Sequence, residues 1–138
     1  MKLVVDANIL FASLIKDSLT AELLLSDKLN LFAPEFLFDE FLRYEEYILK
    51  KTNRSKEGFN HFLHILREEI KIIPQSIITP FIKEAEKFSP DEKDTVYFAC
   101  DLAIDSKIWS NDKKLKEDQK EIEVITTEEL IQEVGFIK

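Results

Sequence analysis

The stretch Leu3-Val4-Val5-Asp6-Ala7-Asn8 places a carboxylate at the end of a short apolar segment. Three apolar residues, two of them β-branched, are typical of a buried strand. In open α/β sheets, ligands gather beyond the carboxyl ends of the strands. A charge beside a buried strand also needs a partner or a metal ion. Asp6 is therefore the first candidate functional residue, and its structural alternative is to cap a helix beginning near Asn8.

The rest of the chain alternates between strand-like and helix-like segments. This alternation predicts an α/β fold of three layers, α/β/α, around a central parallel sheet of about five short strands. Two successive long helices interrupt the alternation and predict an inserted helical hairpin. Beyond the first strand, the predicted strands cover 30–34, 71–74, 107–110 and 122–125, and the predicted helices cover 20–27, 35–51, 55–70, 79–88, 91–105, 112–121 and 127–134.

Length and composition predict a single domain over residues 1–138. The chain has one cysteine, Cys100, and no apolar run of the roughly 20 residues that span a bilayer. We therefore expect a cytoplasmic protein without membrane contact. Only two glycines are present, Gly58 and Gly135, which excludes phosphate-binding loops rich in glycine.

The balance of charges argues against simple binding to a nucleic acid. Lys and Arg number 19 and Asp and Glu number 27, which gives a net charge of −8. Contacts to phosphate usually come from Lys and Arg. A nucleic-acid partner therefore requires a local source of positive charge.

The predicted helix over 35–51 offers two candidate acids. Asp39 pairs with Arg43 at an i,i+4 spacing, which is typical of a solvated surface charge. Glu40 falls instead on the apolar face of the helix and is expected to point into the protein or a cleft. Glu45 is its rival, because it also interrupts apolar neighbours.

The start of the predicted helix over 91–105 has a structural interpretation. Ser89 as N-cap with Glu92 three residues later forms a capping box, and Asp91 then lies in the first turn. Capping does not explain Asp94, which is a functional candidate or an exposed acid. Asp101 follows on roughly the same side and is expected at a rim or on the surface.

A last candidate acid, Asp112, follows a predicted strand and opens a polar helix. Either Ser110 or Asn111 is placed to cap this helix, with Asp112 as a favourable anion in its first turn. The same position at a strand end suits a metal ligand. The sequence leaves both interpretations of Asp112 open.

Together these segments resemble the PIN domain family, in particular its small prokaryotic VapC-type members. The resemblance covers essentially the whole chain, and four motifs occur in the order that the family shows. Ser110 stands where threonine is common in the family. The motifs are Val4-Val5-Asp6-Ala7-Asn8-Ile9-Leu10 and the segments 34–41, 91–99 and 108–115, with Glu40, Asp94 and Asp112 in the acidic places.

The resemblance implies a flap-endonuclease-like nuclease that cuts RNA with Mg²⁺ or Mn²⁺, which are hard cations that prefer oxygen ligands. Metal coordination then falls mainly to Asp6, Asp94 and Asp112. Glu40 is a further ligand or positions the attacking water. Bound metal would also reverse the local charge, which answers the objection raised by the acidic composition.

The resemblance also implies supporting residues. Asn8 and Ser110 are expected to hold the catalytic acids in place. Three lysines just beyond the fourth motif are possible contacts to the RNA backbone: Lys113, Lys114 and Lys116.

For partners, the resemblance implies a homodimer and, in a toxin, an antitoxin protein lying across the helices. Five phenylalanines exceed what one small sheet needs, which predicts an apolar interface. They are Phe36, Phe38, Phe41, Phe59 and Phe62.

Three other functions remain to be weighed. A PIN-like module with an idle metal site would act by binding alone, and a PIN-fold RNA-processing nuclease would act outside any toxin–antitoxin pair. A phosphoacceptor signalling domain fits poorly, because it needs an acidic pair after the first strand and a lysine after the last. Here Asp6 stands alone and Thr126-Thr127 follows the last predicted strand.

Overall fold

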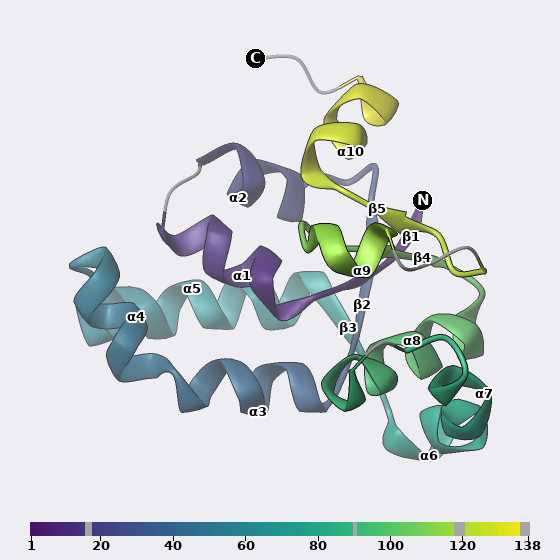
Figure 1. The fold of residues 1–138 in the computed structure, drawn as a ribbon. Coiled ribbons are helices and arrows are strands. Elements are labelled where there is room, and N and C mark those ends of the chain that lie inside the picture. The colour runs from purple at the N-terminus through teal and green to yellow at the C-terminus, as the bar shows by residue number, and fades with distance from the viewer. Residues whose placement is uncertain (16–17, 90, 118–120, 136–138) are drawn as a thin grey trace.

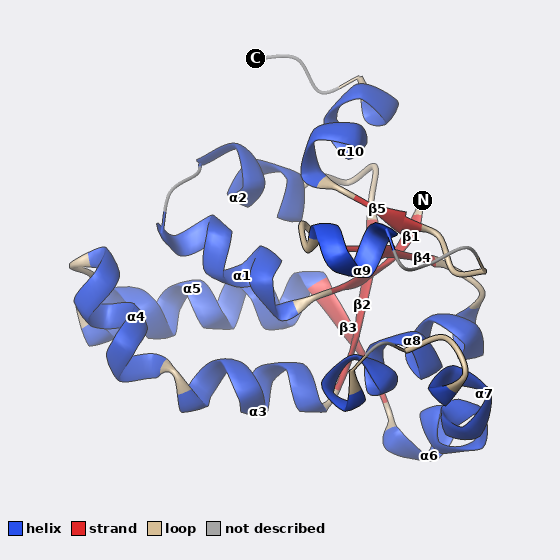
Figure 2. Cartoon of the chain, viewed as in Figure 1, coloured by secondary structure: helices blue, strands red, loops and turns tan. Residues whose placement is uncertain are grey.

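A computed structural model describes residues 1–15, 18–89, 91–117 and 121–135 of the protein. Within them lies one five-stranded sheet with the order β3-β2-β1-β4-β5, in which every neighbouring pair is parallel. Helices pack around this sheet on both faces (Figure 2), so the predicted α/β fold is confirmed. The strands are β1 (Lys2–Val5), β2 (Asn30–Pro34), β3 (Ile70–Ile73), β4 (Lys107–Trp109) and β5 (Val124–Ile125).

The first strand is the centre of the sheet. Val4 of β1 is in register with Phe32 of β2 on one side and with Ile108 of β4 on the other. Leu3, Val4 and Val5 are fully buried. A strand with neighbours on both sides and helices on both faces is enclosed over most of its length, which is why β1 is apolar after the exposed Lys2.

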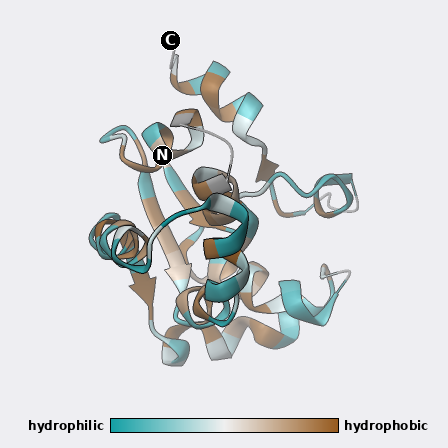
Figure 3. Ribbon diagram, turned by 90° about the vertical axis from the view of Figure 1, so that its left-hand side faces the viewer, coloured by the Kyte–Doolittle hydropathy of each residue, from teal (hydrophilic) through white to brown (hydrophobic). Residues whose placement is uncertain are grey.

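The remaining elements are helices that surround the sheet (Figure 1). The helix α8 packs against β1, β2 and β4, and α1 packs against α2, α3 and α4. Figure 3 shows the hydrophobic strands enclosed by helices with mixed or hydrophilic outer segments. The helices are α1 (Ala7–Ile15), α2 (Ser18–Leu24), α3 (Phe36–Arg43), α4 (Glu45–Thr52), α5 (Lys56–Glu69), α6 (Gln75–Ile78), the 3₁₀ helix η1 (Thr79–Phe81), α7 (Ile82–Glu86), α8 (Glu92–Ile104), α9 (Lys113–Glu117) and α10 (Thr127–Val134).

The predicted helical hairpin is present, but its first arm is two helices rather than one. The chain leaves helical geometry at Tyr44 (φ −100°, ψ 14°), which separates α3 from α4. The turn between α4 and α5 uses Asn53 in the left-handed region (φ 55°), a conformation that asparagine tolerates better than most residues. Ser55 then caps α5 by accepting a hydrogen bond from the backbone N–H of Gly58 (3.0 Å).

Three of the five phenylalanines, Phe38, Phe41 and Phe59, are buried in the core of this hairpin, so the predicted apolar surface is wrong for these three. Phe41 and Phe59 stack with ring centroids 5.7 Å apart, and Phe11 of α1 packs on Phe41 at 5.3 Å. Phe38 is also buried, and Phe36 and Phe62 pack partly buried against the core. Guanidinium groups lie over the rings of these last three, in the pairs Arg67 with Phe38, Arg43 with Phe36, and Arg54 with Phe62.

Several predicted boundaries need correction. The helix α1 was not among the predicted elements, because its residues are apolar on nearly every side and show no amphipathic period. The helix predicted over 79–88 begins at Gln75 and is divided by the 3₁₀ turn that contains Pro80. The residue that caps α8 is Asp91, whose side chain accepts from the N–H of Lys93 (3.0 Å). The predicted Ser89 capping box is therefore wrong.

The C-terminal third follows the prediction more closely. The helix α10 has the predicted bounds, and Thr126 and Glu129 form a capping box at its start. Of the helix predicted over 112–121 the structure shows Lys113–Glu117, and 118–120 lie outside the described residues. Among the helices of the described chain, none has the length and apolar character that crossing a membrane requires.

Candidate functional site

The order of the strands creates a crevice between β1 and β4. β2 and β3 extend the sheet on one side of β1, whereas β4 and β5 lie on the other. At such a switch point the loops beyond the strand ends diverge, and ligands bind between them. Asp6 directly follows β1, and its backbone N–H donates to the carbonyl oxygen of Trp109 in β4 (3.1 Å). Asp6 therefore lies at the mouth of this crevice.

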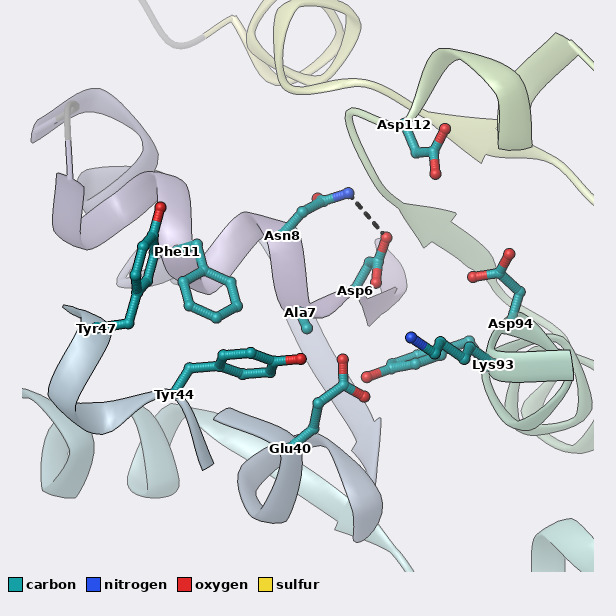
Figure 4. Close-up of a pocket in the computed structure, with 11 residues that line it drawn as sticks. Asp6, Ala7, Asn8, Phe11, Glu40, Tyr44, Tyr47, Lys93, Asp94 and Asp112 are labelled. Atoms are coloured by element: carbon teal, nitrogen blue, oxygen red, sulfur yellow. Dashed lines mark hydrogen bonds between the residues drawn. The ribbon is translucent and has the colours of Figure 1, made fainter. Parts of the chain in front are cut away.

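A pocket of about 480 Å³ opens here, and all four predicted acids line it (Figure 4). Asp6 enters from the end of β1 and Glu40 from α3, whereas Asp94 comes from the first turn of α8. Asp112 lies in the loop between β4 and α9. The volume is within the range of about 300–1,000 Å³ typical of ligand sites. Folding has thus brought four acids from distant parts of the sequence to one cavity.

The rival acids do not line this pocket. Asp39 is exposed on α3, and Glu45 lies at the start of α4. Asp91 caps α8 and borders a smaller adjoining hollow with Asp94 and Asp112. Asp101, expected at a rim or on the surface, is instead buried and accepts a hydrogen bond from the Ser106 hydroxyl (2.6 Å). Burial raises the pKa of Asp101 to about 7.

Asp6 is held by the two residues that the motifs placed beside it. The Ser110 hydroxyl donates to Oδ2 of Asp6 (2.7 Å), and the Asn8 amide donates to the same oxygen (3.0 Å). The Asn8 amide also lies 3.2 Å from Oγ of Ser110, which closes a small network. Since Ser110 is fully buried, this network fixes the orientation of the Asp6 carboxylate.

Asp112 combines the two roles that its sequence context left open. Its Oδ1 accepts from the backbone N–H groups of Lys114 (3.0 Å) and Leu115 (3.2 Å), so it caps α9. Its own N–H donates to Oγ of Ser110 (3.1 Å). The cap therefore anchors Asp112 to the network around Asp6, while its side chain still borders the pocket.

Burial, and then repulsion from neighbouring acids, raises the pKa values of Asp6, Glu40 and Asp94. Burial and then the charge of Asp6 raise the pKa of Glu40. Burial raises the pKa of Asp94 to about 6, with further contributions from Asp6, Asp91, Asp112 and Glu40. Burial and the charge of Asp112 raise the pKa of Asp6, against the Ser110 hydrogen bond, which lowers it. Carboxylates that repel in this way create a strongly negative cavity, which attracts cations.

The chemistry of this donor set suits a hard divalent cation better than any other cofactor. Carboxylate oxygens are the ligands that Mg²⁺ and Mn²⁺ prefer. In the described part of the chain, however, no three carboxylate, imidazole or thiol groups lie close enough together to hold one ion. The acids therefore share a cavity without three of them converging on one point, an arrangement in which water would complete the shell of a bound Mg²⁺.

Two further groups in the pocket were missed by sequence reasoning. Lys93 lines the pocket on the side of Glu40 (Figure 4), and its charge offsets part of the rise in the pKa of Glu40. The Tyr97 hydroxyl is buried and has no hydrogen-bonding partner in the described structure. Its ring lines the same pocket. Tyr97 follows Asp94 by three residues, so helical periodicity alone would have placed both on one face of α8.

The three predicted RNA-contacting lysines differ in their surroundings. Lys113 and Lys114 are exposed, and Lys114 borders the hollow beside Asp94 and Asp112. The ammonium group of Lys116 instead lies 2.7 Å from Glu129 and donates to the carbonyl oxygen of Val124 (2.7 Å). Lys116 therefore joins α9 to α10, whereas the ammonium groups of Lys113 and Lys114 extend from the exposed face of α9.

Comparison with known proteins decides the family. A model of the PIN domain matches residues 4–134, which is nearly the whole chain. The chain belongs to the PIN domain family. Its fold is similar to that of a chain in the crystal structure of VapBC2 from Rickettsia felis bound to a DNA fragment from their promoter. That likeness has a TM-score of 0.63 at 16% identity and covers 91% of this chain and 98% of the other. No curated protein matches this PIN domain in sequence.

Proposed function

We propose that this PIN domain is a metal-dependent endoribonuclease and the toxin of a toxin–antitoxin pair. PIN domains are generally nucleases that use divalent metal ions. The observation that supports the proposal best is the meeting of Asp6, Glu40, Asp94 and Asp112 in one pocket at the sheet's switch point. Capping explains the position of Asp112 alone, and it does not explain why the four acids meet in one pocket.

The four acids divide two tasks between them in this mechanism. Asp6, Asp94 and Asp112 hold the metal, and Glu40 is a further ligand or orients the attacking water. Bound Mg²⁺ or Mn²⁺ supplies Lewis acidity and lowers the pKa of a water molecule. The hydrogen bonds from Asn8 and Ser110 keep the Asp6 carboxylate in one orientation throughout.

Three lysines are placed to interact with the phosphates of a bound RNA. Lys93 is placed to offset the negative charge of the phosphodiester where it meets the acids. Lys113 and Lys114 remain proposed contacts to the flanking RNA backbone. In-line attack by water on phosphorus breaks the bond to the 3′ oxygen and yields a 5′-phosphate and a 3′-hydroxyl.

The test compares variants of adjacent acids on α3. Glu40→Gln removes a pocket charge, whereas Asp39→Asn removes an exposed charge one residue away and serves as the control. Single-stranded RNA is incubated with each protein and with Asp6→Asn, in Mg²⁺, Mn²⁺ or EDTA. We expect Glu40→Gln and Asp6→Asn to lose cleavage, Asp39→Asn to retain it, and EDTA to abolish it. Equal cleavage by wild type and Asp6→Asn would refute the site.

The spread of the acids favours a second candidate, a binding module with an idle metal site. Isothermal titration with Mn²⁺ separates the two functions. An active site binds Mn²⁺ in wild type and Asp39→Asn and binds it more weakly in Asp6→Asn. Absence of Mn²⁺ binding to the wild type would favour the idle module.

Partners and location follow from the same proposal. A cytoplasmic toxin acts on cellular RNA and needs an antitoxin, and we expect an adjacent small gene to encode it. A PIN-fold RNA-processing nuclease would have no such neighbour. The expected homodimer is tested by sedimentation, in which a clean monomer at micromolar concentration would remove it.

A further inference from the structure

The pocket that holds the acids has a second half of different chemistry. Phe11, Tyr44 and Tyr47 line it on the side away from Asp94 and Asp112 (Figure 4). We call these three residues the aromatic wall. Ala7 lies between the two halves, where a small side chain leaves the cavity continuous. Whatever occupies the pocket therefore meets carboxylates at one end and aromatic rings at the other.

The aromatic wall is held in place by the fold. Phe11 packs between Phe41 and Tyr44, with an edge-on contact to the Tyr44 ring at a centroid distance of 5.8 Å and an interplanar angle of 72°. Tyr44 occupies the break between α3 and α4, and its N–H donates to the carbonyl oxygen of Phe41 (3.2 Å). The same break that divides the helix thus directs Tyr44 into the pocket.

The two tyrosines of the aromatic wall are more exposed than the phenylalanines of the hairpin. Tyr44 is 48% and Tyr47 53% exposed, whereas Phe41 and Phe59 of the same hairpin are fully buried. About half of the surface of each tyrosine is therefore left free to contact a ligand. Exposed aromatic side chains beside a charged cavity are typical of ligand binding.

Nucleotides match the two halves of the pocket. Once a cation is bound among the acids, a phosphodiester can bind at that half of the pocket. The base attached to the same nucleotide is a flat aromatic group close enough to reach the aromatic wall. Bases stack on tyrosine and phenylalanine in proteins that bind single strands. Of the described residues that line the pocket, Lys93 alone is cationic, and the protein carries a net charge of −8. Stacking must therefore supply much of the affinity that lysines and arginines supply elsewhere.

We propose that the aromatic wall, with Tyr44 and Tyr47 as its exposed rings, is a stacking site for an unpaired nucleobase next to the phosphate that is cleaved. This inference rests on the proposed nuclease function and adds to it a subsite that binds the base beside the cleaved phosphate. A paired base presents only its edges outside the duplex, so it has no free face for the rings. Binding is expected to depend only weakly on salt, since few phosphate contacts are available.

The test measures stacking without cleavage. The probe is a short single-stranded RNA with one 2-aminopurine, a fluorescent base that is quenched when it stacks, with Ca²⁺ in place of Mg²⁺. A gel run on the same samples verifies that the RNA stays intact. Wild type is expected to quench the probe and to bind the same RNA at least tenfold more weakly when it is annealed to its complement.

Matched variants separate the ring from other properties of the side chain. Tyr44→Leu and Tyr47→Leu remove the ring and are expected to abolish quenching and to weaken binding about tenfold. Tyr44→Phe and Tyr47→Phe retain the ring and should bind as wild type does. Leu42→Ala alters an exposed apolar residue of α3 outside the pocket and is the control. Far-UV circular dichroism checks that each variant is folded.

The outcomes distinguish this inference from the proposed function. If Asp6→Asn abolishes cleavage but both Leu variants bind single-stranded RNA as wild type does, the nuclease stands and the stacking site is overturned. If Asp6→Asn cleaves like wild type, the nuclease proposal fails whatever the tyrosines do. Leu variants that bind RNA normally but sediment differently would identify the aromatic wall as a protein interface, which also overturns the stacking site.

Discussion

Removing one pocket acid should make the metal-free protein more stable. Burial and the neighbouring acids raise the pKa of Asp94 from 3.8 to about 6. At about 1.36 kcal/mol per pKa unit, this rise corresponds to roughly 3 kcal/mol of disfavoured ionisation. Asp94 is only partly buried, so screening by water reduces the effect to about 1–2 kcal/mol. We expect Asp94→Asn to raise the free energy of unfolding by this amount at pH 7.5.

The effect has a defined pH window. Between pH 3.8 and about 6, the unfolded chain loses the Asp94 proton while the folded protein keeps it. The folded state binds more protons there, so wild-type stability falls as pH rises through this interval. Asparagine does not titrate. The difference between Asp94→Asn and wild type is therefore absent below about pH 4, grows from there to pH 6, and is constant above about pH 7.

Urea unfolding from pH 4 to pH 8 in EDTA measures this difference. Trp109 is a suitable fluorescent probe, because it is fully buried and its indole N–H donates to the Thr127 hydroxyl (3.0 Å). Asp39→Asn, at an exposed position, is the control and should change stability little at any pH. Added Mn²⁺ should stabilise the wild type more than Asp94→Asn. An Asp94→Asn protein that is no more stable than wild type at pH 7.5 would show that the acids do not repel.

Three further substitutions test the core and the pocket. Phe41→Ala empties a fully buried site between Phe11 and Phe59 and should cost about 3–5 kcal/mol in urea unfolding. Tyr97→Phe removes a buried hydroxyl without a partner in the described structure, so stability should stay the same or rise by about 1 kcal/mol, and a fall would reveal an unseen partner. Ser110→Ala removes the shorter of the two hydrogen bonds that hold the Asp6 carboxylate and should weaken Mn²⁺ binding about 10- to 100-fold in calorimetry, whereas Ser110→Thr should preserve it.

The strand-end acids were predictable because their positions depend on local rules. A parallel sheet aligns the carboxyl ends of its strands, so Asp6 after β1 and Asp112 after β4 had to lie near one edge. The helical period of α3 separated Glu40, which lines the pocket, from Asp39, which is exposed. Neither inference needed knowledge of long-range packing.

The features that were missed depend on packing between segments far apart in the sequence. The helix α1 has no polar face, because other helices and the sheet cover it, so its amphipathic signal is lost. Excess phenylalanine was interpreted as a surface, yet Phe41 and Phe59 fill the space between the hairpin arms. Tyr44 follows Glu40 by one helical turn, so their shared face was predictable, but the break after α3 was not, because no residue type in that segment announces it.

The hydrogen bond between Ser110 and Asp6 joins groups that are 104 positions apart. During synthesis on the ribosome, Asp6 emerges early and its supporting hydroxyl emerges only after most of the domain. β1 likewise lacks its β4 neighbour until that point. A nascent chain of this PIN domain therefore lacks the assembled pocket around Asp6 until β4 and Ser110 have been synthesised. For the nuclease proposed above, this order of synthesis would spare the encoding RNA until translation of the domain is almost finished.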